Sequence, residues 1–281
     1  MIDETVEEIA ELQTHSSSIV AIKAARALEE LTGRNFATVD EFLRSLERNS
    51  NALRRAEPSH ASLYGTQREI VSRVQAADDV AVSEAKQSLI EVIEAVVERV
   101  ERGKTEAARR AAGGIGDGSV LLTHDYSSTV LEAIELALAA GRSLEVYVTE
   151  ARPRYLGRKM ARTLARHEGV STTLLTDGAA GLALESCDQV LLGMDCIVGE
   201  RFYNRVGTFP LVSTAVQQDV PVHVVGASSK VIESGGFAFE NEFRSTSEVM
   251  REPADGFEMI NPAYDVTPTS LLSAIITDEE P

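Results

Sequence analysis

Two aspartates, Asp125 and Asp195, each follow a short apolar run of the length expected for a buried strand. An open parallel sheet binds its ligands at the carboxyl ends of its strands, so both carboxylates are expected beside one crevice. Two close carboxylates push their pKa values apart, which leaves one protonated as an acid and one ionised as a base. Such a pair could carry the proton transfers that an enediol route needs. The alternative for Asp125 is a cap on the helix expected to begin near Ser128.

Polar residues near these aspartates could hold a phosphorylated ligand. Arg152 precedes Pro153 at the start of an expected helix, where a guanidinium beside free backbone amides makes an anion site. The alternative for Arg152 is an ion pair with Glu150. His124 could act as an acid or base, or serve as hydrogen-bonded scaffolding. The candidate ligand-binding residues are His124, Ser127, Arg152, Asn204, Arg205, Gly207, Thr208 and Lys230.

Two of these candidates leave a second interpretation open. Residues 204–208 combine an amide, a cation and the flexible Gly207, as a sugar-phosphate loop does, but a plain turn would use the same residues. Lys230 follows an expected strand and could reach the crevice, although a solvent-exposed lysine is the commoner fate. Because the net charge of the chain is -17, a phosphate site must depend on local cations such as Arg152, Arg205 and Lys230.

Apolar runs and helical patterns alternate from residue 119 onward, and this alternation predicts the fold class. Strands are expected at 119–123, 144–149, 171–176, 189–193 and 220–226, helices at 130–140, 155–168, 178–184 and 211–218, and a terminal helix or strand at 271–277. Residues 261–268 are expected to form a rigid loop that locks the last element onto the sheet. The prediction is an α/β fold with a Rossmann-like, doubly wound parallel sheet.

The chain before this region is expected to be almost entirely helical, over residues 5–12, 19–31, 39–53, 67–76 and 83–110. The last of these helices carries an apolar stripe, from Leu89 to Val100, that is typical of a core-facing or inter-subunit helix. The glycine cluster at residues 113–118 precedes a strand instead of following one, which excludes a dinucleotide fingerprint. We predict a helical N-terminal domain over residues 1–112 and a Rossmann-like ligand-binding domain over residues 113–281.

Composition excludes several classes of protein. Direct binding to nucleic acid conflicts with a net charge of -17, because that interaction requires clustered Lys and Arg. The acidic excess, the 5 lysines among 27 basic residues and the absence of Trp suggest adaptation to high salt, as in a halophilic archaeon. No apolar run could span a bilayer and the N-terminus lacks a signal peptide, so we expect a cytoplasmic protein. Cys187 and Cys196 lack metal-ligand or redox spacing, and no cofactor is expected.

These motifs resemble the family that joins the alpha, beta and delta regulatory subunits of translation initiation factor 2B to two sugar-phosphate isomerases. Those isomerases act on methylthioribose 1-phosphate and ribose 1,5-bisphosphate. The matching segments, in chain order, are 121–127, 149–153 with Gly157, 193–195, 204–208 and 261–268. The resemblance implies a homodimer or higher homo-oligomer, with dimerisation through the second domain.

The chain departs from the isomerases at two positions. In those enzymes a cysteine after the Thr-His pair works with the aspartate of a Gly-x-Asp motif, and here Asp125 takes the place of that cysteine. Arg205 stands where a lysine is common. The segment at residues 123–127, Thr-His-Asp-Tyr-Ser, is similar to the regulatory subunits, which are not known as enzymes.

Three functions remain open at this stage. The favoured one is a subunit-like protein that binds a phosphorylated sugar or nucleotide and has a translation factor as a further partner. The alternative is a sugar-phosphate isomerase of the ribose 1,5-bisphosphate or methylthioribose 1-phosphate type, with Asp125 and Asp195 as its catalytic residues. The third is an interaction protein whose crevice stays empty.

Overall fold

The computed structural model describes residues 2–11, 17–76, 80–232, 237–252 and 255–279. The chain divides into two compact units, Met1–Gly103 with Ser229–Phe239 and Lys104–Ser228 with Glu240–Pro281. We call them the helical unit and the sheet unit. The helix α5 (Val82–Gly113) continues through the division at Gly103. The division at Gly103 reflects contacts within the folded chain. The domain boundary expected at residues 112–113 stays a prediction.

The helical unit contains α1 (Ile2–Glu11), α2 (Ser17–Ala27), α3 (Val39–Ala56), α4 (Ala61–Gln75) and the first part of α5. A 3-10 turn over Leu28–Gly33 follows α2. The expected helical region is thereby confirmed, and Leu12, the end of the first expected helix, lies outside the described residues. Leu89 and Ile93 of the α5 stripe are buried in a core shared with Phe42, as the helical spacing predicts.

Six parallel strands form the sheet of the second unit in the order β10-β7-β4-β1-β2-β3. They are β1 (Val120–His124), β2 (Leu144–Thr149), β3 (Val170–Leu175), β4 (Gln189–Gly193), β7 (Val222–Val225) and β10 (Ala274–Ile276). The chain winds outward from β1 to β3, returns to β4 beside β1, and winds outward again to β10. The doubly wound sheet is confirmed, and its topological switch point lies between β1 and β4. Asp125 and Asp195 follow these two strands.

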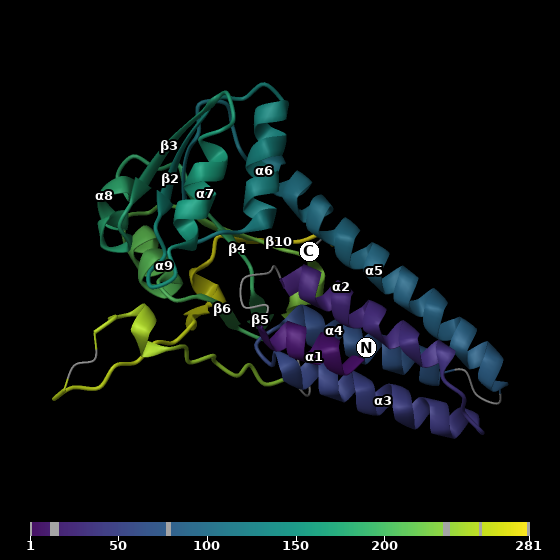
Figure 1. The fold of residues 1–281 in the computed structure, drawn as a ribbon. Helices are drawn as coiled ribbons and strands as arrows, with labels where there is room; N and C mark the ends of the chain where they lie inside the picture. The colour runs from purple at the N-terminus through teal and green to yellow at the C-terminus, as the bar shows by residue number, and fades with distance from the viewer. Residues whose placement is uncertain (1, 12–16, 77–79, 233–236, 253–254, 280–281) are drawn as a thin grey trace. The chain divides into compact units, whose positions relative to one another are not determined.

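Helices between the strands cover the sheet (Figure 1). They are α6 (Ser128–Ala139), α7 (Leu156–Leu164), α8 (Ala180–Leu184) and α9 (Thr208–Gln217). α6 packs against β4, α7 against β2 and β3, and α9 against β7. Leu121, Val146 and Leu191 of the inner strands are at most 1% exposed, which explains why these strands have continuous apolar sequences instead of alternating ones.

A small antiparallel sheet was not expected and changes two predictions. It contains β5 (Cys196–Val198), β6 (Arg201–Arg205) and β9 (Tyr264–Pro268), with β6 paired to both others. The interpretation of residues 261–268 as a rigid loop is therefore wrong for Tyr264–Pro268. Residues 204–208 are also not a single loop, because Asn204 and Arg205 end β6 and Thr208 begins α9. These strands are short and carry polar residues, so only pairing with one another identifies them.

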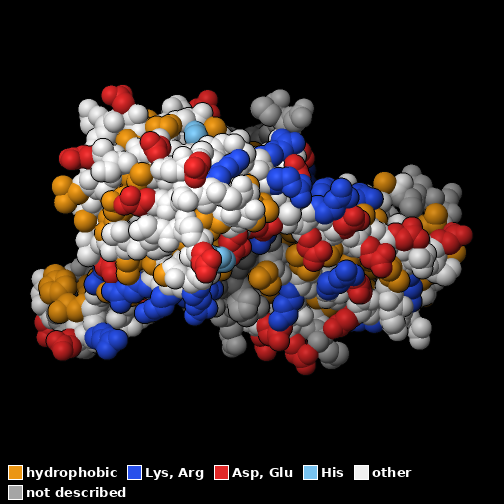
Figure 2. All heavy atoms as spheres, turned by 90° about the horizontal axis from the view of Figure 1, so that it is seen from above, with side chains coloured by type: hydrophobic (Ala, Val, Ile, Leu, Met, Phe, Trp, Pro, Cys, Tyr) orange, Lys and Arg blue, Asp and Glu red, His pale blue; other side chains and the backbone are white. Residues whose placement is uncertain are grey.

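Acidic side chains are spread over the face of the molecule drawn in Figure 2, in keeping with the acidic composition. Among the helices that the structure describes, none combines the length and the apolar character that a membrane span requires.

Candidate functional site

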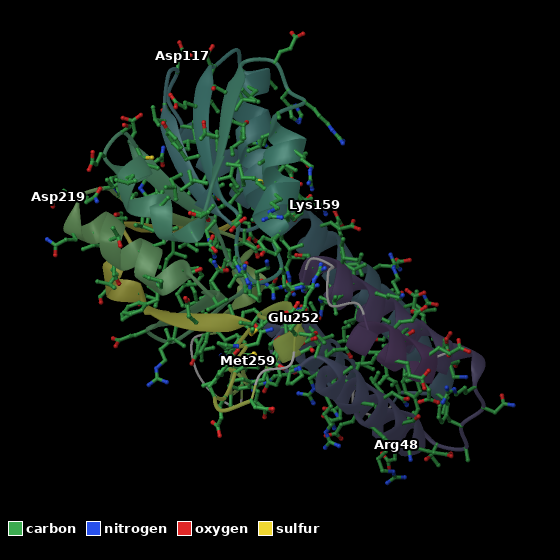
Figure 3. The ribbon with its side chains drawn as sticks, turned by 60° about the vertical axis from the view of Figure 1, so that its left-hand side comes forward. Arg48, Asp117, Lys159, Asp219, Glu252 and Met259 are labelled. Carbon is green, nitrogen blue, oxygen red and sulfur yellow. The ribbon has the colours of Figure 1, made fainter. Side chains whose placement is uncertain are left out.

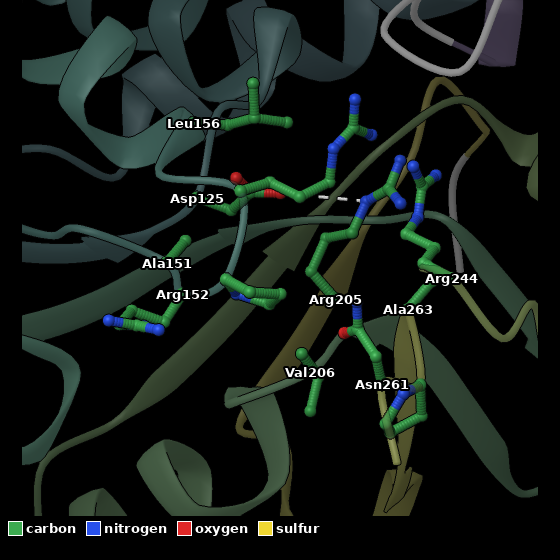
Figure 4. Close-up of a pocket in the computed structure, with 12 residues that line it drawn as sticks. Asp125, Ala151, Arg152, Leu156, Arg205, Val206, Arg244, Asn261 and Ala263 are labelled. Atoms are coloured by element: carbon green, nitrogen blue, oxygen red, sulfur yellow. Dashed lines mark ion pairs between the residues drawn. The ribbon is translucent and has the colours of Figure 1, made fainter. Parts of the chain in front are cut away.

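A pocket open to solvent lies in the sheet unit, at residues that follow the carboxyl ends of β1 and β2 (Figure 4). Its walls combine one carboxylate with several guanidinium groups. The lining residues are Asp125, Ala151, Arg152, Pro153, Arg154, Leu156, Arg205, Val206, Arg244, Asn261, Pro262 and Ala263.

Asp125 is the acidic residue of this lining. Its backbone is left-handed, with a φ of 64°, a conformation that Asp and Asn tolerate better than other side chains. The residue is 7% exposed. Burial raises the pKa of the Asp125 carboxyl, and the positive charge of Arg205 and the nearby His124 oppose that rise without cancelling it. The protonated form is therefore more favoured than in water, which suits a general acid near neutral pH.

Arg205 joins the two aspartates that were predicted to face one crevice. Its Nε atom lies 3.6 Å from Oδ2 of Asp125 and 3.5 Å from Oδ2 of Asp195. Its guanidinium stacks on the ring of Tyr264, with 4.6 Å from Cζ to the ring centroid. Burial lowers the pKa of Arg205, but Asp195, Tyr264 and Asp125 outweigh it and the net shift is upward. Arg205 is thus a permanent cation shared by two carboxylates.

Four arginines and one aspartate line the pocket. Arg205 and Arg244 extend toward the same side of the pocket (Figure 4). Burial lowers the pKa of Arg154, and so do the positive charges of Arg244 and Arg205. Crowded cations of this kind favour an anion in their midst, and guanidinium groups bind phosphoryl oxygens in a bidentate manner. The pocket therefore suits a phosphorylated ligand.

Each of the other arginines is anchored from within the sheet unit. Arg244 pairs with Glu242 at 2.8 Å, and Nε of Arg154 lies 4.0 Å from Glu248. Arg152 is exposed, and its Nη2 donates to a backbone carbonyl, that of Val249, at 3.2 Å. Its guanidinium also lies over the ring of Tyr155, at 5.1 Å from the centroid.

The turn that carries Arg152 is held by Asp177, just beyond β3. The backbone amides of Ala151 and Arg152 each donate to one oxygen of the Asp177 carboxylate, both at 2.7 Å. The ion pair considered between Glu150 and Arg152 is not formed, because Glu150 pairs with Arg158 at 2.7 Å. The carboxylate of Glu150 therefore leaves the charge of Arg152 available to the pocket.

His124 is a scaffold residue in this geometry. Its Nε2 donates to the carbonyl oxygen of Val206 at 3.0 Å, and its Nδ1 lies 2.6 Å from the hydroxyl of Thr149. A Cβ atom on Gly207 would come within 2.8 Å of the His124 ring, so Gly207 is needed for close packing as well as for its φ of 104°. Both ring nitrogens are engaged by the protein.

Asp265 of β9 was not recognised as a site residue. Its Oδ2 accepts hydrogen bonds from the backbone amides of Gly207 and Phe209, at 2.8 and 3.0 Å, and so caps the N-terminus of α9. Thr208 is fully buried, donates to the carbonyl of Arg205 at 2.7 Å and accepts from the Asn204 amide at 3.0 Å. These bonds fix the position of Arg205 without occupying its guanidinium.

Removal of this cap is expected to destabilise the sheet unit. Asp265→Ala should lower the free energy of unfolding by about 1–2 kcal/mol, because two backbone amides of α9 lose their acceptor. Asp265→Asn keeps an acceptor oxygen and should lose less than half of that amount. Urea unfolding followed by circular dichroism measures both values, and equal stability of the Ala variant and the parent would show that the cap contributes nothing.

The sequence and the structure of the chain were compared with those of known proteins. The model of the initiation factor 2 subunit family matches residues 13–279. The chain belongs to this family. A ribose 1,5-bisphosphate isomerase from Haloferax volcanii is 30% identical, covering 98% of this chain and 86% of the relative. A methylthioribose-1-phosphate isomerase from Pelotomaculum thermopropionicum is also 30% identical, over 86% of this chain and 71% of the relative. A solved structure described as the Pyrococcus horikoshii translation initiation factor eIF-2B has a TM-score of 0.82 at 26% identity and covers 99% of this chain and 94% of its own.

In this member of the initiation factor 2 subunit family, the predicted site residues take four kinds of position. Asp125, Arg152 and Arg205 line the pocket, and Asp195 reaches it through its contact with Arg205. Ser127 caps α6 by accepting from the amide of Val130 at 3.3 Å. Lys230 is buried, not solvent-exposed, and belongs to the helical unit, so its role toward the ligand stays a prediction. The residues that support the turns around the pocket are His124, Asn204, Gly207 and Thr208.

Sequence reasoning missed Arg154, Arg244 and Asn261 as pocket residues. Arg154 stands two residues after Arg152 in the same motif, so its proximity could have been inferred. Arg244 lies in a stretch without helical or strand periodicity, where no local pattern indicates which way a side chain points. Within the described residues, no group of three or more His, Cys, Asp or Glu side chains could hold a metal ion. Burial raises the pKa of Cys187 to about 11, which keeps its thiol neutral.

Proposed function

We propose that this protein is a sugar-phosphate isomerase of the ribose 1,5-bisphosphate type, in which Asp125 and Asp195 move the protons. The observation that carries the proposal is a buried carboxyl with a raised pKa, Asp125, in a pocket lined by four arginines. The arginines can bind phosphoryl groups. The protonated carboxyl can act as a general acid, which a protein that only binds its ligand would not need. The relative from Haloferax volcanii, named for this activity, is 30% identical over 98% of the chain.

The chemistry needs two proton transfers and no redox partner. In ribose 1,5-bisphosphate the C1 phosphate excludes a free aldehyde, so the bond from C1 to the ring oxygen must break and that oxygen must gain a proton. A proton moves from C2 to C1, and the hydroxyl proton of C2 is lost as the ketone forms. We assign the transfers between oxygens to Asp125 and the transfer between carbons to Asp195.

The test is turnover. Ribose 1,5-bisphosphate and methylthioribose 1-phosphate are each incubated with the protein in molar KCl, and the ketose product is followed by phosphorus and carbon NMR. Formation of ribulose 1,5-bisphosphate supports the proposal, and turnover of only the second compound changes the assigned substrate. Absence of product from both compounds, with a folded protein, contradicts the isomerase assignment.

A second candidate rests on the position of Asp125. The Thr-His-Asp-Tyr-Ser segment favours a subunit-like protein of the translation initiation factor 2B type, and the Pyrococcus horikoshii structure so described is 26% identical. In this role the pocket binds a phosphorylated sugar or nucleotide without turnover, and a translation factor is the further partner. A rise in melting temperature with AMP or a sugar phosphate, together with no isomerisation, would favour this candidate. No rise with any of these compounds would support an interaction protein with an empty crevice.

Arg152 provides a prediction common to both candidates. Arg152→Ala should weaken binding of the phosphorylated ligand by about 10-fold or more, because a guanidinium at the pocket contributes roughly 1.5–3 kcal/mol through charge-assisted hydrogen bonds. Arg166 is exposed and does not line the pocket, so Arg166→Ala is the matched control. Thermal shift titrations with the ligand give both dissociation constants, and equal effects of the two substitutions would count against the pocket.

A further inference from the structure

The two proposed catalytic carboxylates differ in their access to the pocket. Asp125 and Arg205 line it, whereas Asp195 is not among the lining residues. Oδ2 of Asp195 is buried and accepts no hydrogen bond, and its contact is the ion pair with Nε of Arg205 at 3.5 Å. Arg205 therefore covers Asp195 on the side of the pocket. Oδ2 of Asp195 becomes available to a ligand in the pocket only when this guanidinium moves.

The surroundings of Arg205 allow such a movement. Its contacts with both aspartates use the Nε atom, at 3.5 and 3.6 Å, which are ion-pair distances longer than an optimal charge-assisted hydrogen bond. The ring of Tyr264 supports the guanidinium by stacking, an interaction that tolerates sliding across the ring face. The two neighbouring cations, Arg154 and Arg244, repel it toward any anion that enters between them.

We propose that a phosphoryl group entering the pocket draws Arg205 away from Asp125 and Asp195, and that Asp125 then shifts further toward its protonated form by taking up protons from solvent. The proposal rests on the proposed function, because it assigns to the same site the event that prepares its acid and base. Binding of the anion leaves Asp125 more fully protonated and frees Oδ2 of Asp195 from its ion pair with Arg205. Isomerisation thereby starts only in a site that holds a phosphorylated compound.

The charges around Asp125 set the direction of this proton transfer. Three charged or titratable groups act on Asp125: His124 at the end of β1, Arg205 at the end of β6, and Asp195 in the turn after β4. Arg205 and His124 lower its pKa, whereas burial and Asp195 raise it. Withdrawal of Arg205 removes the main opposing charge, and the incoming phosphoryl anion adds a negative one. Both changes raise the pKa of Asp125, so the proton is gained and not lost.

Proton uptake on binding is measurable without turnover. Inorganic phosphate is titrated into the full-length protein by calorimetry near neutral pH, in buffers with different ionisation enthalpies. The parent protein should take up more protons per bound phosphate than Asp125→Asn does. Asp219→Asn is the matched control, because Asp219 is exposed, also has a positive φ of 57°, and lies just beyond α9 (Figure 3). It should retain the uptake of the parent.

A second variant tests Arg205 itself. In Arg205→Gln the cation is absent before phosphate arrives, so Asp125 is already protonated and the additional uptake should fall to near zero. Equal proton uptake by the parent and Asp125→Asn, or undiminished uptake in Arg205→Gln, would overturn the proposed withdrawal of Arg205. Failure of the parent to bind phosphate would overturn it as well. Turnover without this proton uptake rejects only the proposed withdrawal of Arg205. Proton uptake on phosphate binding without turnover rejects only the isomerase assignment.

Discussion

Asp125→Asn is expected to lower kcat for isomerisation of ribose 1,5-bisphosphate by about 10³-fold, since general acid–base catalysis by one side chain contributes roughly 10²–10⁴. The amide has nearly the shape of the carboxyl but cannot donate and regain a proton. Asn is also the replacement that best tolerates the left-handed backbone at this position, where φ is 64°. The loss should therefore appear in kcat while the melting temperature stays at or above that of the parent, because burial disfavours the ionised carboxyl.

Initial-rate kinetics with the two purified variants Asp125→Asn and Asp219→Asn measure this effect. The control makes the same substitution at Asp219, which is also an aspartate with a positive φ but lies at the surface. Its kcat should equal that of the parent within about twofold. Full activity in Asp125→Asn would remove this side chain from the reaction, and a large fall in melting temperature would assign its role to folding.

Gly157→Ala is expected to destabilise the sheet unit by about 3 kcal/mol or more, or to prevent folding. Gly157 lies in the first turn of α7, where the helix meets the end of β2. A Cβ atom at this position would overlap the carbonyl oxygen of Thr149 and approach its carbon to 2.9 Å. Both clashing atoms belong to the backbone, so no side-chain rotation can relieve the overlap and α7 must shift away from the sheet.

Gly178→Ala is the matched control for this substitution. Gly178 lies in the short 3-10 turn before α8, and its φ is not positive. A Cβ atom added there would have no neighbouring atom within 4 Å. The replacement should leave stability unchanged or raise it slightly, because Ala restricts the unfolded chain. Chemical unfolding of both variants gives the comparison, and a Gly157→Ala protein as stable as the control would refute the close approach of α7 to β2.

The centre of the parallel sheet was predictable because its inner strands are buried on both faces. Residues 144–149 and 189–193, expected as strands from their apolar sequences, are β2 and β4 with the same bounds. The polar clusters at the ends of β1, β2 and β4 indicated the site, because carboxylate and guanidinium groups are rarely found within a buried strand. The antiparallel strands β5, β6 and β9 were missed because they are short and partly polar, and because the pairing of β6 with β9 joins residues about 60 positions apart.

The sequence by itself determined the family, the doubly wound sheet and the two aspartates at its switch point, because periodicity and strand ends are local properties of the chain. Tertiary structure alone decided the partners of those residues. It placed Arg205 between Asp125 and Asp195, turned both nitrogens of His124 toward protein acceptors and donors, and brought Arg244 to the pocket. Charges act over a few ångströms in space, whereas the residues that exert them here lie up to about 120 positions apart in the chain.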